Sequence, residues 1–94
     1  MLGETIKKLR KEKGYSQQGF ARKLKLNNPY YNCIENDKQE PSIPTLRNIC
    51  KHLDINIHIL FIMSLKREDV PEEKRKQYDF IMPSILEMAM SLVD

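Results

Sequence analysis

The fold is decided by the stretch from Ser16 to Ser42, which reads SQQGFARKLKLNNPYYNCIENDKQEPS. It predicts two short amphipathic helices, residues 16–24 and 28–35, joined by a tight turn. The apolar side chains that share one face of each helix are Phe20, Ala21 and Leu24, then Tyr31 and Ile34. Two helices packed at a steep angle leave the outer face of the second free to enter a DNA groove. The stretch therefore predicts a helix-turn-helix.

Capping residues extend this pattern in both directions. Gly14 ends a first helix over residues 2–13, and the N-caps of the next four helices are Ser16, Asn27, Ser42 and Asn56. The sequence thus predicts five helices in total within about sixty residues, and no alternating pattern indicates a strand. The sequence predicts an all-α fold: a five-helix DNA-binding domain over residues 1–64, a linker over 65–71 and a C-terminal helical segment over 72–94.

Charge is unevenly distributed along the chain. Residues 1–40 hold nine Lys and Arg against five Asp and Glu, a net charge of +4. From Lys66 onward five basic residues meet seven acidic ones, a net charge of −2. A positive N-terminal half favours a polyanionic partner, although lysine-rich helices are also simply soluble.

No cofactor, metal site or catalytic centre is expected. Cys33 and Cys50 form no disulfide framework, and Cys50, His52 and His58 lack paired zinc-ligand spacing, so we expect Cys50 in the core. The histidines have no partnered nucleophile, which excludes the usual enzyme constellations. No signal peptide or transmembrane run is present, so the sequence favours a cytoplasmic, DNA-associated protein without a membrane.

The C-terminal segment carries a broad apolar face. Its members at coiled-coil spacing are Tyr78, Ile81, Ile85, Met88 and Leu92, and Pro83 predicts either a kink or two helices meeting near Met82. Such a face marks an interface. Homodimerisation is the favoured interpretation, while folding back on the domain and docking a different regulatory protein stay open.

At this point residues 3–61 resemble the Cro and lambda-repressor type of helix-turn-helix, the XRE family. The matching positions, in family order and spacing, are Leu9-Arg10, Ser16-Gln17, Phe20-Ala21, Leu24, Ile34-Glu35-Asn36, Pro41-Ser42, Leu46, Leu53 and Leu60-Phe61. In layout alone, the chain also resembles SinR-like regulators, which add a C-terminal helical multimerisation segment.

The resemblance implies roles for individual residues. Those expected to face base edges are Asn28, Pro29, Asn32 and Cys33. Those expected to contact the DNA backbone are Gln17, Tyr30, Asn36 and Lys38, with Gln17 also bracing the recognition helix. Arg10 and Glu35 occupy positions that pair in some members; as an ordinary surface pair they would contribute about 0–1 kcal/mol.

The residues themselves support part of this assignment. Asn28 and Asn32 are four apart and project from one side of their helix, and an asparagine amide can pair with adenine in the major groove. Three departures from the family pattern stand out. Pro29 and Cys33 are poor hydrogen-bonding partners for bases, and Asp37 replaces glycine in a turn that needs a left-handed residue. Gly19 lies inside a helix, at a cost of up to ~1 kcal/mol, and leaves room for another backbone or for DNA.

Together these observations predict a DNA-binding transcriptional regulator of bacterial or phage origin, most simply a repressor. A homodimer would bind double-stranded DNA at a palindromic operator, with half-sites about 10 base pairs or a multiple apart. The alternative is a protein-interaction module, or an antitoxin, whose C-terminal helix binds a partner protein.

Overall fold

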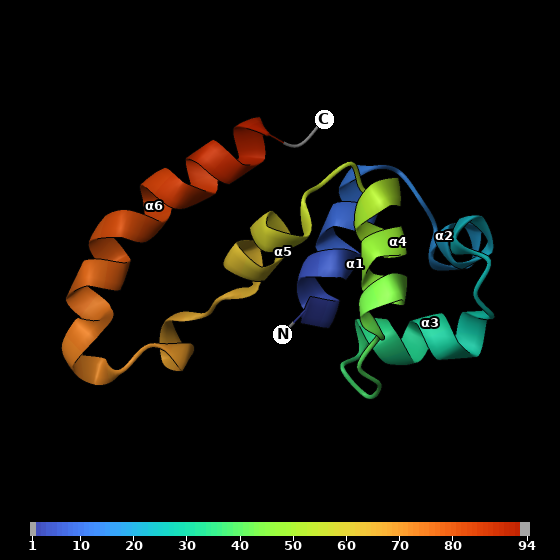
Figure 1. Ribbon diagram of the computed structural model, residues 1–94, viewed down its shortest axis with the longest axis horizontal. Helices are drawn as coiled ribbons and strands as arrows, with labels where there is room; N and C mark the ends of the chain where they lie inside the picture. Colours follow the sequence, from blue (N-terminus) through green and yellow to red (C-terminus); the bar gives the residue numbers. More distant parts are fainter. Residues whose placement is uncertain (1, 93–94) are drawn as a thin grey trace.

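The computed structural model describes residues 2–92, and this part of the chain is entirely helical (Figure 1). Its elements are α1 (Leu2–Glu12), α2 (Gln17–Leu24), α3 (Asn28–Glu35), α4 (Ile43–His52), α5 (Ile57–Ser64), the short 3₁₀ turns η1 (Arg67–Asp69) and η2 (Glu72–Lys74), and α6 (Arg75–Ser91). The predicted all-α class is confirmed. The expected linker contains η1, and α6 begins only after η2.

Helices α1 to α5 enclose one hydrophobic core. Its buried members are Ile6, Leu9, Phe20, Ala21, Leu24, Tyr31, Ile34, Leu46, Ile49, Cys50, Leu53, Ile55 and Leu60. The rings of Phe20 and Tyr31 meet edge to face with their centroids 5.6 Å apart, which joins the two helices of the motif directly. The amphipathic faces read from the sequence therefore meet in this core, and Cys50 lies within it as expected.

Each predicted N-cap forms its hydrogen bond. The oxygens of Ser16, Asn27 and Ser42 accept from the backbone N–H groups of Gly19 (2.9 Å), Tyr30 (2.8 Å) and Thr45 (3.3 Å). Asn56 Oδ1 accepts from the N–H of His58 at 2.7 Å. These bonds satisfy backbone donors that the first helical turn leaves unpaired, and they set where α2 to α5 begin.

Two glycines mark close approaches. A Cβ on Gly19 would lie 2.8 Å from Ser16 Oγ, so its missing side chain makes room for the capping hydroxyl. From the sequence we expect Gly19 to leave room for another backbone or for DNA, but the atom that a side chain there would meet is the Ser16 hydroxyl of the same helix end. At Gly3, a Cβ would lie 2.6 Å from the Ile34 carbonyl oxygen, so α1 packs directly on the end of α3. Asp37 has φ 57°, the left-handed conformation expected for it, and its Oδ1 accepts from the Gly3 N–H at 3.0 Å.

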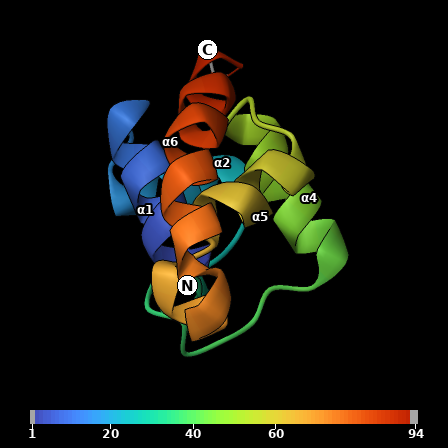
Figure 2. The same ribbon diagram turned by 90° about the vertical axis from the view of Figure 1, so that its left-hand side faces the viewer.

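After α5 the chain leaves the domain through the two 3₁₀ turns, and α6 then runs back along α5 (Figure 2). Pro83 lies inside it, and the ribbon bends along its length without breaking into two helices, so the kinked alternative applies (Figure 1). Met82 and Ala89 are buried, and Tyr78 and Ile85 are half-buried. Residues 93 and 94 of the expected C-terminal segment lie outside the described residues.

The core gives the stability of the protein an alkaline limit. Burial raises the pKa of the Cys50 thiol from 9.0 to about 11, and burial together with a hydrogen bond to Glu35 raises the pKa of Tyr31 far above its usual value. The folded state holds both protons more tightly than the unfolded chain. The stability that these two protons contribute is therefore complete below pH ~9 and is lost above it, by up to about 1.4 kcal/mol per pH unit for each group.

Urea unfolding between pH 8 and 10.5 measures this fall. Replacing Cys50→Ala should flatten the slope above pH 9, because alanine has no proton to release, while Tyr31 still contributes above pH ~10. An unchanged slope in the Cys50→Ala variant would contradict the assignment.

Candidate nucleic-acid interface

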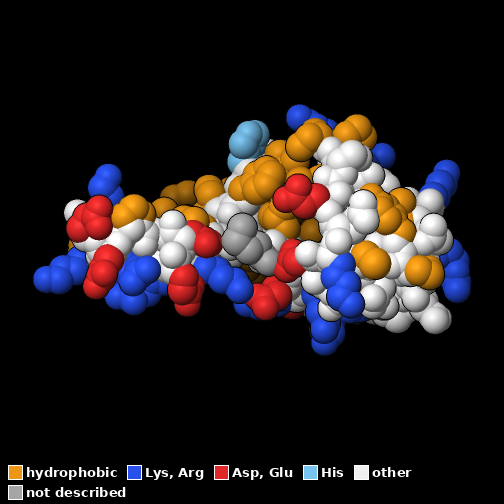
Figure 3. All heavy atoms as spheres, turned by 90° about the horizontal axis from the view of Figure 1, so that it is seen from below, with side chains coloured by type: hydrophobic (Ala, Val, Ile, Leu, Met, Phe, Trp, Pro, Cys, Tyr) orange, Lys and Arg blue, Asp and Glu red, His pale blue; other side chains and the backbone are white. Residues whose placement is uncertain are grey.

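The outer face of the motif is formed by α3 and the N-terminal end of α2. Helix α3 contains one charged residue, Glu35, and its side chain is turned inward and buried. In Figure 3, which views the molecule from the side of α3, the right-hand end is mostly uncharged with Lys and Arg side chains at its margin. An uncharged hydrogen-bonding surface inside a basic rim suits base edges flanked by phosphates.

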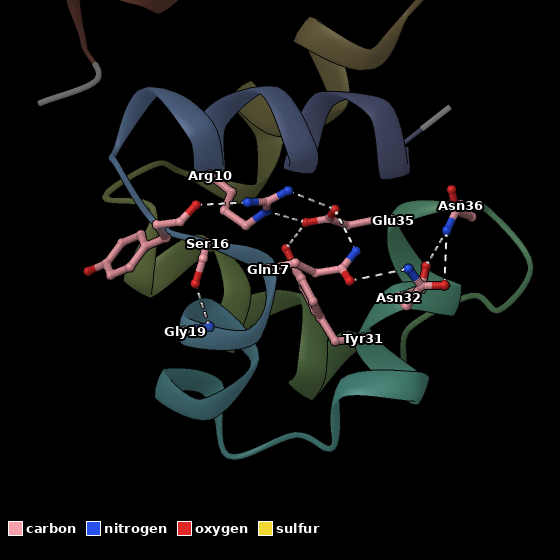
Figure 4. Close-up of polar contacts among 9 residues, drawn as sticks. Arg10, Ser16, Gln17, Gly19, Tyr31, Asn32, Glu35 and Asn36 are labelled. Carbon is pink, nitrogen blue, oxygen red and sulfur yellow. Dashed lines mark hydrogen bonds and ion pairs between the residues drawn. The ribbon is translucent and has the colours of Figure 1, made fainter.

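A buried ion pair joins α1 to α3 beneath this face (Figure 4). Arg10 Nε donates to Glu35 Oε2 at 2.7 Å and Arg10 Nη2 donates to Oε1 at 3.2 Å. Arg10 Nη1 also donates to the carbonyl oxygen of Tyr15 at 2.7 Å. Arg10 is 5% exposed and Glu35 is 3% exposed, so the interpretation as an ordinary surface pair is wrong. The hydrogen bond to Glu35 raises the pKa of Arg10 further, which keeps the guanidinium charged.

Gln17 connects this pair to the outer face. Its Nε2 donates to Glu35 Oε1 at 3.3 Å, and its Oε1 accepts from Asn32 Nδ2 at 3.3 Å. Asn36 Nδ2 in turn donates to Asn32 Oδ1 at 3.1 Å and to the Asn32 carbonyl oxygen at 2.9 Å. Figure 4 shows the three amides in a row that starts at the carboxylate. Gln17 thus braces α3, while a phosphate contact by the Asn36 amide would compete with its bonds to Asn32.

Asn28 is oriented differently from Asn32. Its Oδ1 is buried and has no hydrogen-bond partner within the described residues 2–92. It borders a surface pocket of about 280 Å³ whose other lining residues are Gln18, Ala21, Arg22 and Leu26. A buried unpaired carbonyl costs about 1–3 kcal/mol. Bidentate contact with a base would require the Asn28 side chain to turn outward, and that turn would relieve this cost.

The remaining candidates differ in exposure. Pro29 and Lys38 are exposed, Cys33 is half-buried, and Tyr30 is half-buried with its side chain packed on the core. The structure therefore links Gln17, Asn32 and Asn36 into one network and leaves the other candidates outside it.

Tyr31 also contacts the buried ion pair, which the sequence alone does not predict. The sequence places Tyr31 on the apolar face of its helix, and in the structure its hydroxyl donates to Glu35 Oε2. The signal was the spacing: Tyr31 and Glu35 are four residues apart on α3, so their side chains lie on one face of the helix.

The described residues 2–92 contain no group of three or more His, Cys, Asp or Glu side chains placed to hold a metal ion. None of the helices described is long and apolar enough to cross a membrane.

A compact helical domain whose second helix braces the third, and whose third helix has a polar outer face, is that of a DNA-binding protein. Residues 6–60 match the helix-turn-helix family profile. The chain therefore belongs to the XRE-type helix-turn-helix family of transcriptional regulators, whose members are DNA-binding proteins and not enzymes.

Similar proteins agree with this assignment. The chain is 41% identical over 61 residues to the HTH-type transcriptional regulator SinR of Bacillus subtilis, covering 64% of this chain but only 55% of SinR. It is 43% identical over 61 residues to the control protein C.MunI of Mycoplasma sp, covering 64% of this chain and 82% of that protein. A solved structure of a SinR protein/SinI protein complex matches with a TM-score of 0.63 and 36% identity, over 89% of this chain and 81% of that one.

Proposed function

We propose that the protein is a repressor that binds a palindromic operator as a homodimer, with α3 of each subunit in the major groove. The observation that carries this proposal is the outer face of α3, where hydrogen bonds hold the Asn32 amide between Gln17 and Asn36. A preorganised amide loses little freedom when it meets a base, so such a face favours sequence readout over general attraction.

The DNA contacts divide by chemistry. Base edges would meet Asn28, Asn32 and the apolar surfaces of Pro29 and Cys33, the last two against thymine methyl groups. The backbone would meet Gln17, Tyr30, Asn36 and Lys38. The exposed lysines and arginines of the N-terminal half would supply most of the affinity, which should fall steeply with salt.

The residues of the expected dimerisation seam differ in how exposed they are. Tyr78 and Ile85 turn partly toward the chain's own domain, whereas Ile81, Met88 and Leu92 are 47%, 63% and 61% exposed. Helix α6 also lies at the opposite end of the molecule from α3 (Figure 1). Pairing through these three residues would thus leave α3 free, and linking two weak half-site contacts raises the overall affinity.

Selection of bound sequences from a random duplex pool at near-physiological salt tests the proposal. A two-fold symmetric motif is expected. Enrichment of no sequence, with binding that vanishes as salt rises, would overturn it.

Alanine substitutions at Asn28 and Asn32 test the readout itself. Each should weaken binding to the selected operator about 5- to 150-fold, the worth of one bidentate base contact, with little effect on random DNA at low salt. The fold should survive, because Asn28 Oδ1 has no partner to lose and Asn32 is only half-buried. Fluorescence anisotropy measures both affinities, and Gln77→Ala, an exposed amide on α6, is the matched control. Equal weakening on operator and random DNA would contradict base readout.

A second candidate function is a protein-interaction module with α6 as its docking helix. It is favoured by the exposed apolar residues of α6 and by the matching SinR structure, which is a complex with SinI. A monomeric purified protein with no operator would favour this function over the first.

A further inference from the structure

The Glu35 carboxylate accepts four hydrogen bonds. Oε2 accepts from Arg10 Nε at 2.7 Å and from the Tyr31 hydroxyl, and Oε1 accepts from Arg10 Nη2 at 3.2 Å and Gln17 Nε2 at 3.3 Å. Two carboxylate oxygens offer about four acceptor positions, so these donors fill them. Because an ionised carboxylate only accepts, Gln17 must turn the nitrogen of its amide, and not the oxygen, toward Glu35.

That orientation is passed along the row of amides. With Nε2 turned inward, Gln17 presents Oε1 to Asn32, which must then donate from Nδ2 at 3.3 Å. Asn32 Oδ1 consequently faces Asn36, whose Nδ2 donates to it at 3.1 Å. Asn36 cannot reverse this arrangement, because its Nδ2 also donates to the Asn32 carbonyl oxygen at 2.9 Å. The charge on the buried Glu35 carboxylate thus fixes the orientation of the three amide groups in the row.

The hydrogen-bonding capacity left on Asn32 matches one base. Its amide has two N–H groups and about two lone pairs, and the row uses one of each. One N–H and one lone pair remain. Adenine presents one acceptor, N7, and one donor group, N6, in the major groove, so the unused pair is what bidentate contact consumes.

We propose that Gln17 and Asn36 are positioning residues for base readout, holding the Asn32 amide in the single orientation that Glu35 dictates. Discrimination at the base pair facing Asn32 then depends on two side chains that do not touch that base. The inference rests on the proposed function, in which Asn32 faces base edges. It differs from the backbone contacts proposed for Gln17 and Asn36, because losing a phosphate contact weakens binding to every sequence alike.

The test measures the ratio of affinities for the selected operator and for its single-base variants. Gln17→Met and Asn36→Ala should each lower this ratio about tenfold, within the range of one bidentate contact, and at the same base pair as Asn32→Ala. The double variant Gln17→Met/Asn32→Ala should lose no more discrimination than Asn32→Ala alone, since both changes break one unit. Gln18→Met, the adjacent exposed glutamine of α2, is the matched control and should keep the ratio unchanged.

A measurement on the free protein separates this inference from the DNA-binding proposal. The side-chain amide of Asn32 should show an NMR order parameter close to that of the rigid backbone, about 0.85, falling below about 0.6 in Gln17→Met but not in Gln18→Met. A mobile Asn32 amide in the wild-type protein would overturn the row of fixed amides, whatever the DNA result. An unchanged affinity ratio in Gln17→Met, with all duplexes bound more weakly, would overturn the positioning role while leaving operator binding intact.

Discussion

Replacing Arg10→Ala should lower the free energy of unfolding by about 3–5 kcal/mol, because it strands a buried carboxylate without its cation. Glu35 would keep only the Tyr31 hydroxyl and the Gln17 amide, two neutral donors, as partners. The carbonyl oxygen of Tyr15 would also lose the Arg10 donor at 2.7 Å. Domains of this size have a total stability of about 5–15 kcal/mol, so the variant should lose a large fraction of it.

Urea unfolding monitored by circular dichroism gives the value, and two further variants isolate its cause. Arg67→Ala breaks an exposed pair, with Arg67 Nε 3.0 Å from Asp79 Oδ1, and should cost less than about 1 kcal/mol. The double variant Arg10→Met/Glu35→Met leaves no stranded charge and should be more stable than Arg10→Ala alone. A cost for Arg10→Ala as small as that for Arg67→Ala would show that the pair behaves as a surface one.

Placing charges on Ile81 and Met88, two exposed apolar residues of α6, should have the largest effect on operator binding. The double variant Ile81→Glu/Met88→Glu places two carboxylates where apolar side chains would meet across a dimer interface. Losing the dimer should reduce operator affinity about 10²- to 10⁴-fold, the usual gain from linking two weak contacts. The subunit itself should stay folded, because Ile81 and Met88 are exposed and the buried Met82 and Ala89 are kept. Removing α6 altogether would be less informative, since it would also expose the surface of α5 that α6 contacts.

Analytical ultracentrifugation and operator titration check this prediction together. Phe80→Glu is the control, because Phe80 is 85% exposed on another face of the same helix. It should leave both the dimer and the operator affinity unchanged. A dimer that survives the Ile81/Met88 change would place the subunit interface elsewhere, and an equal effect of Phe80→Glu would indicate general damage to α6.

Local chemistry explains why much of the fold was predictable. The caps at Ser16, Asn27, Ser42 and Asn56 depend on bonds to backbone groups two or three residues away, and all four form. The left-handed turn at Asp37 is equally local. The apolar faces follow from the helical repeat of 3.6 residues, so they can be predicted without knowing the surface against which each helix packs.

The predictions that needed tertiary information were less complete. The depth of the pair between Arg10 and Glu35 depends on how α1 crosses α3, which no spacing reveals. Helix α6 is apolar over more than one stripe, so periodicity could not tell that Tyr78 and Ile85 are half-buried while Ile81 and Met88 are exposed. The inward turn of the Asn28 oxygen is a rotamer choice, and sequence position says nothing about it.

The separation of α3 and α6 has a consequence for gene duplication. The molecule is 42 Å long, and the two helices lie at its opposite ends (Figure 1). A duplicated copy could change its preferred DNA sequence through α3 while its α6 stayed the same. Under the proposed pairing, the two products would still form mixed dimers, which would recognise asymmetric sites made of one half from each parent. Paralogues would become independent regulators only after a second round of change at Ile81, Met88 and Leu92.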